Sequence, residues 1–295
     1  MDQHDPSILF RPTAIATLCN NRAIDELRLF CKSLQIWMEQ PPPIYCYCSS
    51  DVQTQIQKDN LGYGAKIHTN VGLDKYATLS REEMERRPSP SGLSNLFHDF
   101  TQEKCTLMQW ALSEEKSQQG VLFCDVDLIW FGPLPLIPVG PTLGLSPHMI
   151  RTVDEAKYGE YNAGFVWTND PKMPAVWRAA CRSSRFFEQA ALEDLADALP
   201  DEQLYKFPIQ CNYGWWRMFQ SEQTPQQQQK QWSFEQQSDG QTTGITIQGQ
   251  PFVCIHTHLH TNDATTQLFN IFVKKQLEIC KNRNPKAFLL YQILL

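Results

Sequence analysis

The sequence predicts an α/β protein built on a mostly parallel sheet flanked by helices. Short β-prone runs alternate with stretches of helical periodicity, beginning with TAIATLC at 13–19, an amphipathic stretch from Ala23 to Glu39, and IYCYC at 44–48. A strand, a helix and a second strand at this spacing form a parallel βαβ unit. The chain has 295 residues, 42% of them hydrophobic, which is enough apolar material for one large core.

The rest of the first half continues the alternation. Prolines 41–43 end the first helix, and AKIHTN at 65–70 is a third predicted strand. The polar, proline-bearing stretch 81–95 is predicted to be a surface loop. A strong helical pattern over 96–116 then leads into VLFC at 121–124, which has the composition of a buried strand.

The second half predicts fewer helices and more strands. TLGLSPHMI at 142–150 and YNAGFVWTND at 161–170 are predicted strands, and a helix follows from Pro174 to Cys181. The Gln-rich segment 219–243 is predicted to be a loop or an exposed hairpin. Two strand-like runs in ITIQGQPFVCIHTHLH precede a closing helical tail over 263–295. There is no internal repeat and no clear linker, so we expect a single domain over 1–295.

Composition and charge narrow the class of protein. The net charge of -6 disfavours the broad basic surface that nucleic-acid binding needs, so nucleic acid is not an expected partner. The start, MDQHDPSILFRP, lacks the basic and apolar regions of a signal peptide, and no run reaches the roughly 20 apolar residues of a transmembrane segment. The ten cysteines are scattered through apolar runs, which predicts buried thiols in a reducing compartment. These features predict a cytoplasmic protein.

The strongest chemical signal is the pair Asp125 and Asp127, which follows the apolar run VLFC. Ligands of open α/β sheets bind outside the carboxyl ends of the strands. Two carboxylates one residue apart at such an end can share Mg²⁺ or Mn²⁺, which in turn bridges phosphate oxygens. The alternative is a pair of solvated acids that simply end a strand.

A histidine cluster adds to this signal. HTHLH places His256, His258 and His260 directly after the β-run FVCI. Imidazole suits Mn²⁺ or Zn²⁺ as a further ligand beside two carboxylates. Each histidine taken alone is as well explained by a structural role.

Together these segments resemble a known family. VLFCDVDLIWFGPLP, YNAGFVWTND, DEQLYKFPIQCN and FVCIHTHLH occur in the order and rough spacing of nucleotide-diphospho-sugar glycosyltransferases of the GT-A fold. The resemblance covers about residues 13 to 260, and its most specific parts are the DxD region and the asparagine-glycine strand. It implies a Rossmann-like sheet with a nucleotide-binding half at 13–130, an acceptor and metal half at 131–262 that is β-rich, and a helical tail at 263–295.

The resemblance also implies roles for individual residues. It assigns Asp125 and Asp127 to a Mn²⁺ or Mg²⁺ ion and the donor beside it, and His256 or His258 as a further ligand of this ion. The side chains of His256 and His258 point to the same face of a strand, so the sequence does not decide between these two histidines. Donor contacts fall to Thr17, Leu18, Cys19, Lys104, Asn162, Ala163 and Gly164. The catalytic motif near the reacting carbon falls to Asp201, Glu202 and Gln203, although a helix N-cap explains Asp201 equally well. Trp215, Trp216 and Arg217 are candidates for an acceptor platform.

The implied reaction is transfer of a sugar from a nucleotide-diphosphate donor, UDP by family frequency, to a hydroxyl of a glycan or protein-linked acceptor. A divalent cation would stabilise the charge that develops on the departing diphosphate. A general base would come from Asp99, Asp154 or Glu160 if the reaction inverts the anomeric centre.

Other protein classes fit the sequence less well. A haloacid-dehalogenase-like phosphatase also has DxD after a strand, but Leu128 and Ile129 follow where that motif has glycine and threonine. A sugar nucleotidyltransferase would need a glycine-rich N-terminal loop, and LCNNRAIDE has no glycine. A metal-dependent hydrolase would need the aspartate of HxHxDH, which HTHLH lacks. A catalytically inactive sugar-binding module is the remaining alternative.

Overall fold

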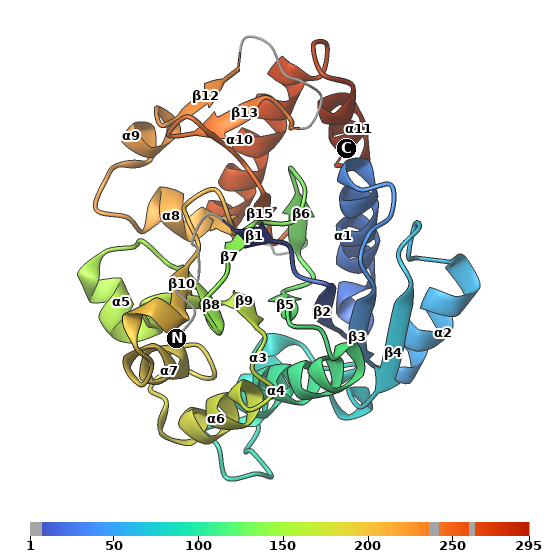
Figure 1. The fold of residues 1–295 in the computed structure, drawn as a ribbon, viewed down its shortest axis with the longest axis vertical. Coiled ribbons are helices and arrows are strands. Elements are labelled where there is room, and N and C mark those ends of the chain that lie inside the picture. The colour runs from blue at the N-terminus through green and yellow to red at the C-terminus, as the bar shows by residue number, and fades with distance from the viewer. Residues whose placement is uncertain (1–7, 236–241, 260–262, 295) are drawn as a thin grey trace.

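A computed structural model describes residues 8–235, 242–259 and 263–294. Its centre is a seven-stranded sheet, and the α/β class and mostly parallel sheet are confirmed (Figure 1). In spatial order the strands are β10 (Leu204–Lys206), β8 (Leu143–Pro147), β9 (Tyr161–Thr168), β5 (Val121–Cys124), β2 (Ala14–Cys19), β3 (Ile44–Cys48) and β4 (Ile67–Val71).

One strand of this sheet runs against the others. β9 pairs antiparallel with both β5 and β8, whereas the other neighbours pair in parallel. The start of β9 therefore lies at the edge where β5 ends, and the backbone N–H of Asp125 donates to the carbonyl of Gly164 at 2.9 Å. This reversal brings the asparagine-glycine strand to the DxD segment.

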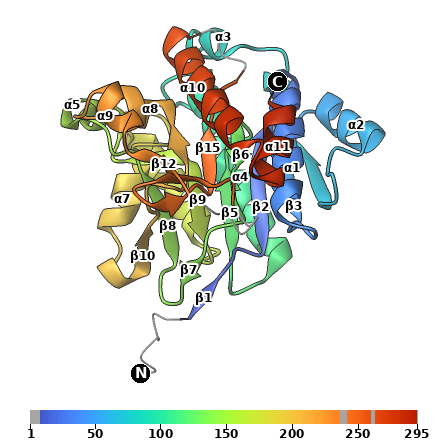
Figure 2. The ribbon, with the colours of Figure 1, turned by 90° about the horizontal axis from the view of Figure 1, so that it is seen from above.

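Helices cover both faces of the sheet because the strand residues alternate between two apolar clusters. Ile15 belongs to the cluster beneath α1 (Ile24–Trp37) and α2 (Ser50–Asp59), whereas Ala14 and Ala16 pack toward the opposite face. The helices on that opposite face are α4 (Leu96–Glu115), α6 (Met173–Ala180) and α7 (Ala191–Asp197). Figure 2 shows the same layers from above.

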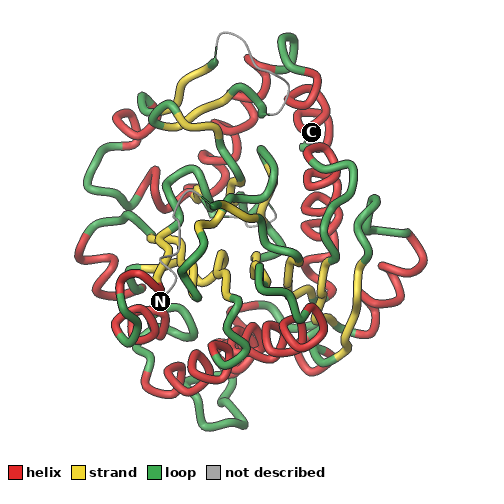
Figure 3. Tube along the Cα trace, in the orientation of Figure 1, coloured by secondary structure: helices red, strands yellow, loops and turns green. Residues whose placement is uncertain are grey.

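Two small sheets build the β-rich C-terminal region. The first has the order β11 (Tyr213–Gly214), β15 (Cys254–His256) and β6 (Leu128–Trp130). The second comprises β12 (Trp232–Phe234), β13 (Ile245–Ile247) and β14 (Gln250–Pro251), and a two-stranded pair joins β1 (Leu9–Phe10) to β7 (Ile137–Pro138). Figure 3 shows these strands in yellow among the helices and loops.

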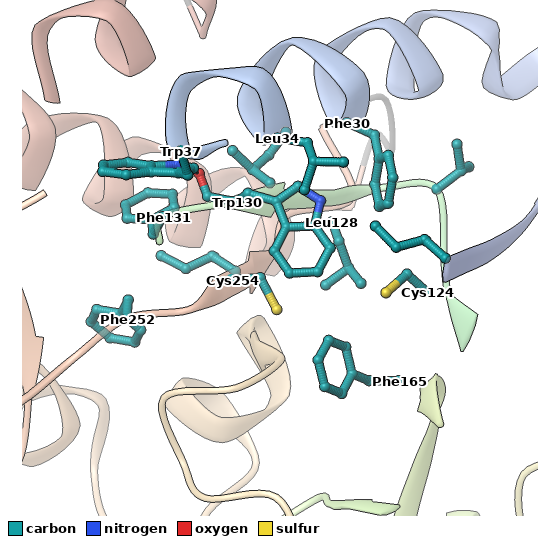
Figure 4. Close-up of a cluster of buried hydrophobic side chains, with 14 of the residues drawn as sticks. Phe30, Leu34, Trp37, Cys124, Leu128, Trp130, Phe131, Phe165, Phe252 and Cys254 are labelled. Atoms are coloured by element: carbon teal, nitrogen blue, oxygen red, sulfur yellow. The ribbon is translucent and has the colours of Figure 1, made fainter. Parts of the chain in front are cut away.

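The first small sheet is anchored to α1 by packing and by two hydrogen bonds. Apolar residues at helical spacing, from Leu27 to Trp37, make one face of α1 buried. Trp37 Nε1 donates to the Trp130 carbonyl at 2.8 Å, and the Trp130 N–H donates to Ser33 Oγ at 3.0 Å. Figure 4 shows Trp130 and Phe131 beneath this helix, with Phe165 of the main sheet on the far side. β6 therefore has a fixed position relative to the end of β5.

The closing helices are α10 (Ala264–Cys280) and α11 (Pro285–Ile293), and α11 packs against α1. The predicted tail helix is thus confirmed, with Ala287 and Leu290 buried in the core. No described helix is long and apolar enough to cross a membrane. All ten cysteines are free and buried, as the sequence predicts.

Two predicted loops contain regular structure. The stretch 81–95 begins with α3 (Arg81–Glu85), which has a capping box between Ser80 and Glu83. The Gln-rich segment contains α9 (Pro225–Gln229) and strand β12, and Trp232 is buried there among aromatic rings. The segment was predicted to be a loop or an exposed hairpin. β12 does pair antiparallel with β13, as in a hairpin, but α9 was not predicted and Trp232 is buried rather than exposed. Residues 236–241 lie outside the described residues.

The remaining short helices are α5 (Thr152–Tyr158) and α8 (Trp215–Phe219), together with 3-10 turns at Asn21–Ala23, Asp74–Tyr76, Cys181–Ser183 and Asp201–Gln203.

Candidate functional site

A cleft of about 710 Å³ lies where the parallel strands of the main sheet end. Its lining includes residues at or just after the ends of four strands: Leu18 and Asn20 at the end of β2, Asp125 and Asp127 after β5, His148 after β8, and His256 and His258 at the end of β15. Further lining residues come from the helices and loops around it: Arg22, Glu26, Arg81, Phe97, Phe100, Lys104, Tyr158, Asn162, Phe186, Phe187, Glu188, Gln189, Trp215, Trp216, Asp263 and Thr266. The volume is in the range of small-molecule sites.

The first carboxylate, Asp125, forms an ion pair with a buried lysine. Lys104 Nζ lies 3.0 Å from Asp125 Oδ1 and 2.8 Å from Glu188 Oε1, and it donates to the Ala163 carbonyl at 3.1 Å. Burial alone would lower the pKa of Lys104, but the two carboxylates raise it above its ordinary value. Burial raises the pKa of Asp125, whereas that of Glu188 is lowered because Lys104 outweighs its burial. The ammonium group of Lys104 thus lies between the carboxylates of Asp125 and Glu188.

The second carboxylate, Asp127, faces two histidines. Asp127 Oδ1 lies 2.8 Å from His256 Nε2, and Oδ2 lies 2.7 Å from His258 Nδ1. The two imidazole rings stack with centroids 4.5 Å apart. Burial would raise the pKa of Asp127, but the adjacent imidazoles hold it well below its ordinary value. His260 lies outside the described residues.

Backbone pairing fixes these three side chains. In the small sheet His256 lies opposite Leu128, the residue after Asp127, and the Thr257 N–H and Oγ1 both donate to the Asp127 carbonyl at 3.1 Å. The atoms that Asp127, His256 and His258 offer to a ligand lie within 4.8 Å of one another.

These three residues fit a divalent cation. His256 Nε2 is buried and faces a carboxylate oxygen of Asp127 at 2.8 Å. Carboxylate oxygen and imidazole nitrogen together suit a borderline or hard divalent ion such as Mn²⁺. The site is therefore chemically suited to a metal.

The asparagine-glycine strand closes this side of the cleft. Asn162 Oδ1 accepts from the Gly164 N–H at 2.9 Å. A Cβ built on Gly164 would lie 2.7 Å from His256 Cε1 and 2.8 Å from Asn162 Oδ1. Asn162 lines the cleft, while Ala163 contributes its carbonyl to Lys104. All three residues of the predicted segment thus lie beside the carboxylates.

An aromatic wall, which comprises Tyr158, Phe186, Phe187 and Phe97, lies on the side of Glu188. Ring centroids are 5.0 Å apart for Tyr158 and Phe186, 4.7 Å for Phe186 and Phe187, and 5.0 Å for Phe187 and Phe97. Phe187 has φ of 45°, an unfavourable conformation for a bulky residue, and this places its ring and the neighbouring Glu188 at the cleft.

The structure separates the predicted donor contacts of the first strand. Leu18 lines the cleft, whereas Thr17 and Cys19 are fully buried and their side chains point into the protein. Cys19 Sγ donates to the Ala23 carbonyl at 3.4 Å. Of the predicted platform, Trp215 and Trp216 line the cleft, and Arg217 is instead buried against backbone carbonyls such as that of Pro147 at 2.6 Å.

The predicted catalytic motif is not brought to the carboxylate pair. Asp201, Glu202 and Gln203 immediately precede β10, which runs parallel to β8, so they lie at the amino-end edge of the sheet, away from the cleft. The Gln203 carbonyl accepts from the Thr142 N–H at 2.8 Å there. None of the three lines the cleft, and neither do the candidate bases Asp99, Asp154 and Glu160.

Two polar residues that line the cleft, Glu188 and Gln189, were not singled out from the sequence. Gln189 Oε1 accepts from the Ala163 N–H at 3.4 Å, and Glu188 pairs with Lys104. The dipeptide Glu-Gln occurs at five places in the sequence, 39–40, 188–189, 202–203, 222–223 and 235–236, so the dipeptide alone does not single out the copy at the cleft. The direction of the neighbouring strands decides which copy reaches the cleft.

No protein-family model matches the sequence, and no curated protein matches it either. Similar solved structures include the glycosyltransferase GlyE of Streptococcus pneumoniae TIGR4, which is 14% identical, with a TM-score of 0.41 over 68% of this chain and 46% of that chain. The galactosyltransferase LgtC, solved with donor and acceptor sugar analogs, is 12% identical, with a TM-score of 0.46 over 89% of this chain and 95% of that chain. Mouse xyloside xylosyltransferase 1 is 11% identical, with a TM-score of 0.44 over 70% and 89% of the two chains. This chain spans about half the length of GlyE, covering 46% of it.

Proposed function

We propose that this chain is a glycosyltransferase of the GT-A type that transfers a sugar from a nucleotide-diphosphate donor to an acceptor hydroxyl. The observation that carries the proposal is the meeting of Asp125, Asp127 and His256 at one point of the cleft, beside Asn162 and Gly164. The order of the motifs along the sequence supports the same class.

The proposed metal ligands are Asp127 and His256, with His258 and Asp125 next to them. A divalent cation, Mn²⁺ or Mg²⁺, would supply electrostatic stabilisation of the departing diphosphate. Lys104 holds Asp125 in place and keeps a positive charge at the same side of the cleft. UDP is the favoured nucleotide.

Glu188 and Gln189 are the proposed polar groups beside the reacting sugar. Glu188 is buried, and its pKa is lowered because Lys104 outweighs burial, so it remains an ionised acceptor at neutral pH. Gln189 Nε2 donates to the Tyr158 carbonyl at 2.8 Å, which fixes the amide. In this role the pair replaces Asp201, Glu202 and Gln203.

The acceptor side is proposed to be the aromatic wall. Tyr158, Phe186, Phe187 and Phe97 offer apolar surface next to Glu188. The phenylalanines carry no polar atom on their side chains, so the wall favours an acceptor glycan or glycoprotein that presents an apolar group beside its hydroxyl. The ten buried free thiols favour a reducing, cytoplasmic location.

A thermal-shift panel tests the donor site. UDP, GDP, dTDP and CMP would each be added with and without Mn²⁺, because a ligand that binds only the folded state raises its stability. We expect one nucleotide to stabilise the protein only in the presence of Mn²⁺, and Asp127→Asn to abolish this effect. No shift with any nucleotide would overturn the proposal and direct the work to phosphatase assays. Binding without turnover of the nucleotide sugar would indicate an inactive sugar-binding module.

A further inference from the structure

We propose that Asn212 is a positioning residue that presets His256 as a metal ligand. In this role Asn212 accepts a hydrogen bond from His256 Nδ1 and fixes the ring so that Nε2 faces Asp127. The proposal rests on the proposed metal site, and it separates His256 from His258, which the sequence leaves equivalent.

A backbone amide fixes the orientation of the Asn162 side chain. The Gly164 N–H is a donor only, and it lies 2.9 Å from Asn162 Oδ1, so that atom of Asn162 is the carbonyl oxygen. The other end of Asn162 is then the NH₂ group, which donates to His148 Nε2 at 3.2 Å. His148 Nδ1 lies 2.7 Å from the Gly159 carbonyl, an acceptor, so His148 has its proton on Nδ1 and accepts at Nε2. Both ends of Asn162 are therefore consistent with one orientation.

A hydrogen bond to Asn162 sets the orientation of the Asn212 side-chain amide. Its Nδ2 donates to Asn162 Oδ1 at 2.9 Å and to Ser146 Oγ at 3.2 Å. The opposite orientation would place two carbonyl oxygens against each other at that first contact. Asn212 Oδ1 consequently faces His256 Nδ1 at 3.0 Å, and because this oxygen can only accept, the proton lies on His256 Nδ1.

The fold holds Asn212 rigidly in this position. The residue is fully buried, and its N–H lies 3.2 Å from Cys254 Sγ. It has φ of 55°, a left-handed conformation that asparagine tolerates better than most residues. It directly precedes β11, which pairs in parallel with the strand that carries His256.

With Nδ1 donating to Asn212, Nε2 is the nitrogen of His256 that faces Asp127, 2.8 Å from Oδ1. Without a metal, a proton on Nε2 makes this contact an ion pair, and a bound cation would take the place of that proton. Ligating histidines generally donate their other N–H to an acceptor that fixes the ring, and Asn212 occupies that place here. His258, by contrast, faces Asp127 through Nδ1 and is 30% exposed, on a residue with φ of 46°.

Binding of Mn²⁺ alone, measured by calorimetry, tests the role of Asn212. Asn212→Gly keeps the left-handed backbone accessible and removes the acceptor, and we expect the Kd for Mn²⁺ to rise about 10- to 100-fold. Asn212→Asp keeps an acceptor for His256 and should bind Mn²⁺ more tightly than Asn212→Gly, although its second oxygen faces Asn162 Oδ1 and lowers the free energy of unfolding. The matched control is Ser146→Ala, which removes another partner of Asn212 but leaves its oxygen on His256; it should lower stability without changing the Kd.

A spectroscopic test distinguishes the two histidines. Pulsed electron paramagnetic resonance of bound Mn²⁺ detects coupling between the metal and imidazole ¹⁴N. We expect His256→Gln to lose this ¹⁴N coupling and His258→Gln to retain it. The reverse pattern, or an unchanged Kd in Asn212→Gly, would overturn the positioning role while leaving the metal site intact. If the wild-type protein bound no Mn²⁺, the metal site itself would fail, and this role with it.

Discussion

Gly164 leaves the space that the Asp125 carboxylate needs, since a Cβ on Gly164 would lie 2.5 Å from Asp125 Oδ2. The same Cβ would also meet His256 and Asn162, so Gly164→Ala must displace the groups that border the proposed metal. We expect this variant to lose most Mn²⁺ binding and transferase activity while it remains folded.

Gly144→Ala on neighbouring β8 is the matched control for Gly164→Ala. Its methyl group would lie 2.9 Å from Phe207 Cε2 and 3.2 Å from Trp167 Cε3, in the core and away from the cleft. It should lower the free energy of unfolding and leave Mn²⁺ affinity unchanged. Equal loss of Mn²⁺ binding in both variants would show that Gly164 acts only through stability.

The second prediction concerns the contribution of the buried Lys104 to stability. Lys104→Met leaves Asp125 and Glu188 without their shared cation, and we expect a loss of about 3–5 kcal/mol in the free energy of unfolding at pH 7. Adding Glu188→Gln to this variant should recover part of the loss, because one uncompensated charge is removed. Urea unfolding measures both. Lys206→Met, which breaks the exposed pair with Glu160, should cost about 0–1 kcal/mol, and an equal cost for both lysines would contradict the argument.

Because His148 is buried, we expect the protein to lose stability in mild acid. Burial lowers the pKa of His148 from its ordinary value of 6.5 to about 4. Between pH 6.5 and pH 4 the unfolded chain binds a proton at His148 that the folded protein does not bind. The contribution of neutral His148 to the free energy of unfolding is therefore complete above pH 6.5 and declines as the pH falls toward 4. The full decline corresponds to about 3 kcal/mol.

The comparison of wild type with His148→Gln isolates this contribution. The free energy of unfolding of the variant should fall less between pH 7 and pH 4, as measured by urea unfolding at each pH. Parallel pH curves for the two proteins would show that His148 is not held neutral.

The aromatic wall predicts which acceptors are preferred. Phe97→Ala removes a ring from the cleft, and we expect the KM for acceptors with an octyl or phenyl group to rise about 10-fold while methyl glycosides are unaffected. kcat should change little, because the ring contributes equal binding in ground and transition states. Phe288→Ala, at an exposed site on α11, is the control. Equal KM changes for both acceptor types would contradict an apolar subsite.

The parts of the site that follow from local sequence were predictable. Asp125 and Asp127 directly follow a four-residue apolar strand, and His256 follows another, so each could be placed at a strand end without knowledge of the topology. The βαβ unit at the start of the fold could also be predicted, from the spacing of its apolar residues. Which histidine binds the metal was not, because it depends on contacts between residues far apart in the chain, such as Asn212 and Asn162.

Strand direction is the part that the sequence did not reveal. β9 is buried along its whole length, as β5 is, yet it runs antiparallel to both β5 and β8. The carboxyl-end rule therefore located Asp125 correctly but gave no means of choosing between Glu188 and Glu202. Thr17 and Cys19 are buried beneath the cleft that Leu18 reaches, so their side chains do not line it.

The burial of every thiol gives this protein a set of internal reporters of local unfolding. A reagent that alkylates cysteine can reach Cys124 in β5 or Cys254 in β15 only when that element opens, so the labelling rate at each position measures the local free energy of opening. Burial raises the pKa of Cys254 to about 12, so this thiol stays unreactive until its strand opens. Cys181 differs, because hydrogen bonding from Cys105 lowers its pKa to about 6 despite burial. Its labelling rate therefore depends on its thiolate fraction as well as on the opening of the 3-10 turn Cys181–Ser183.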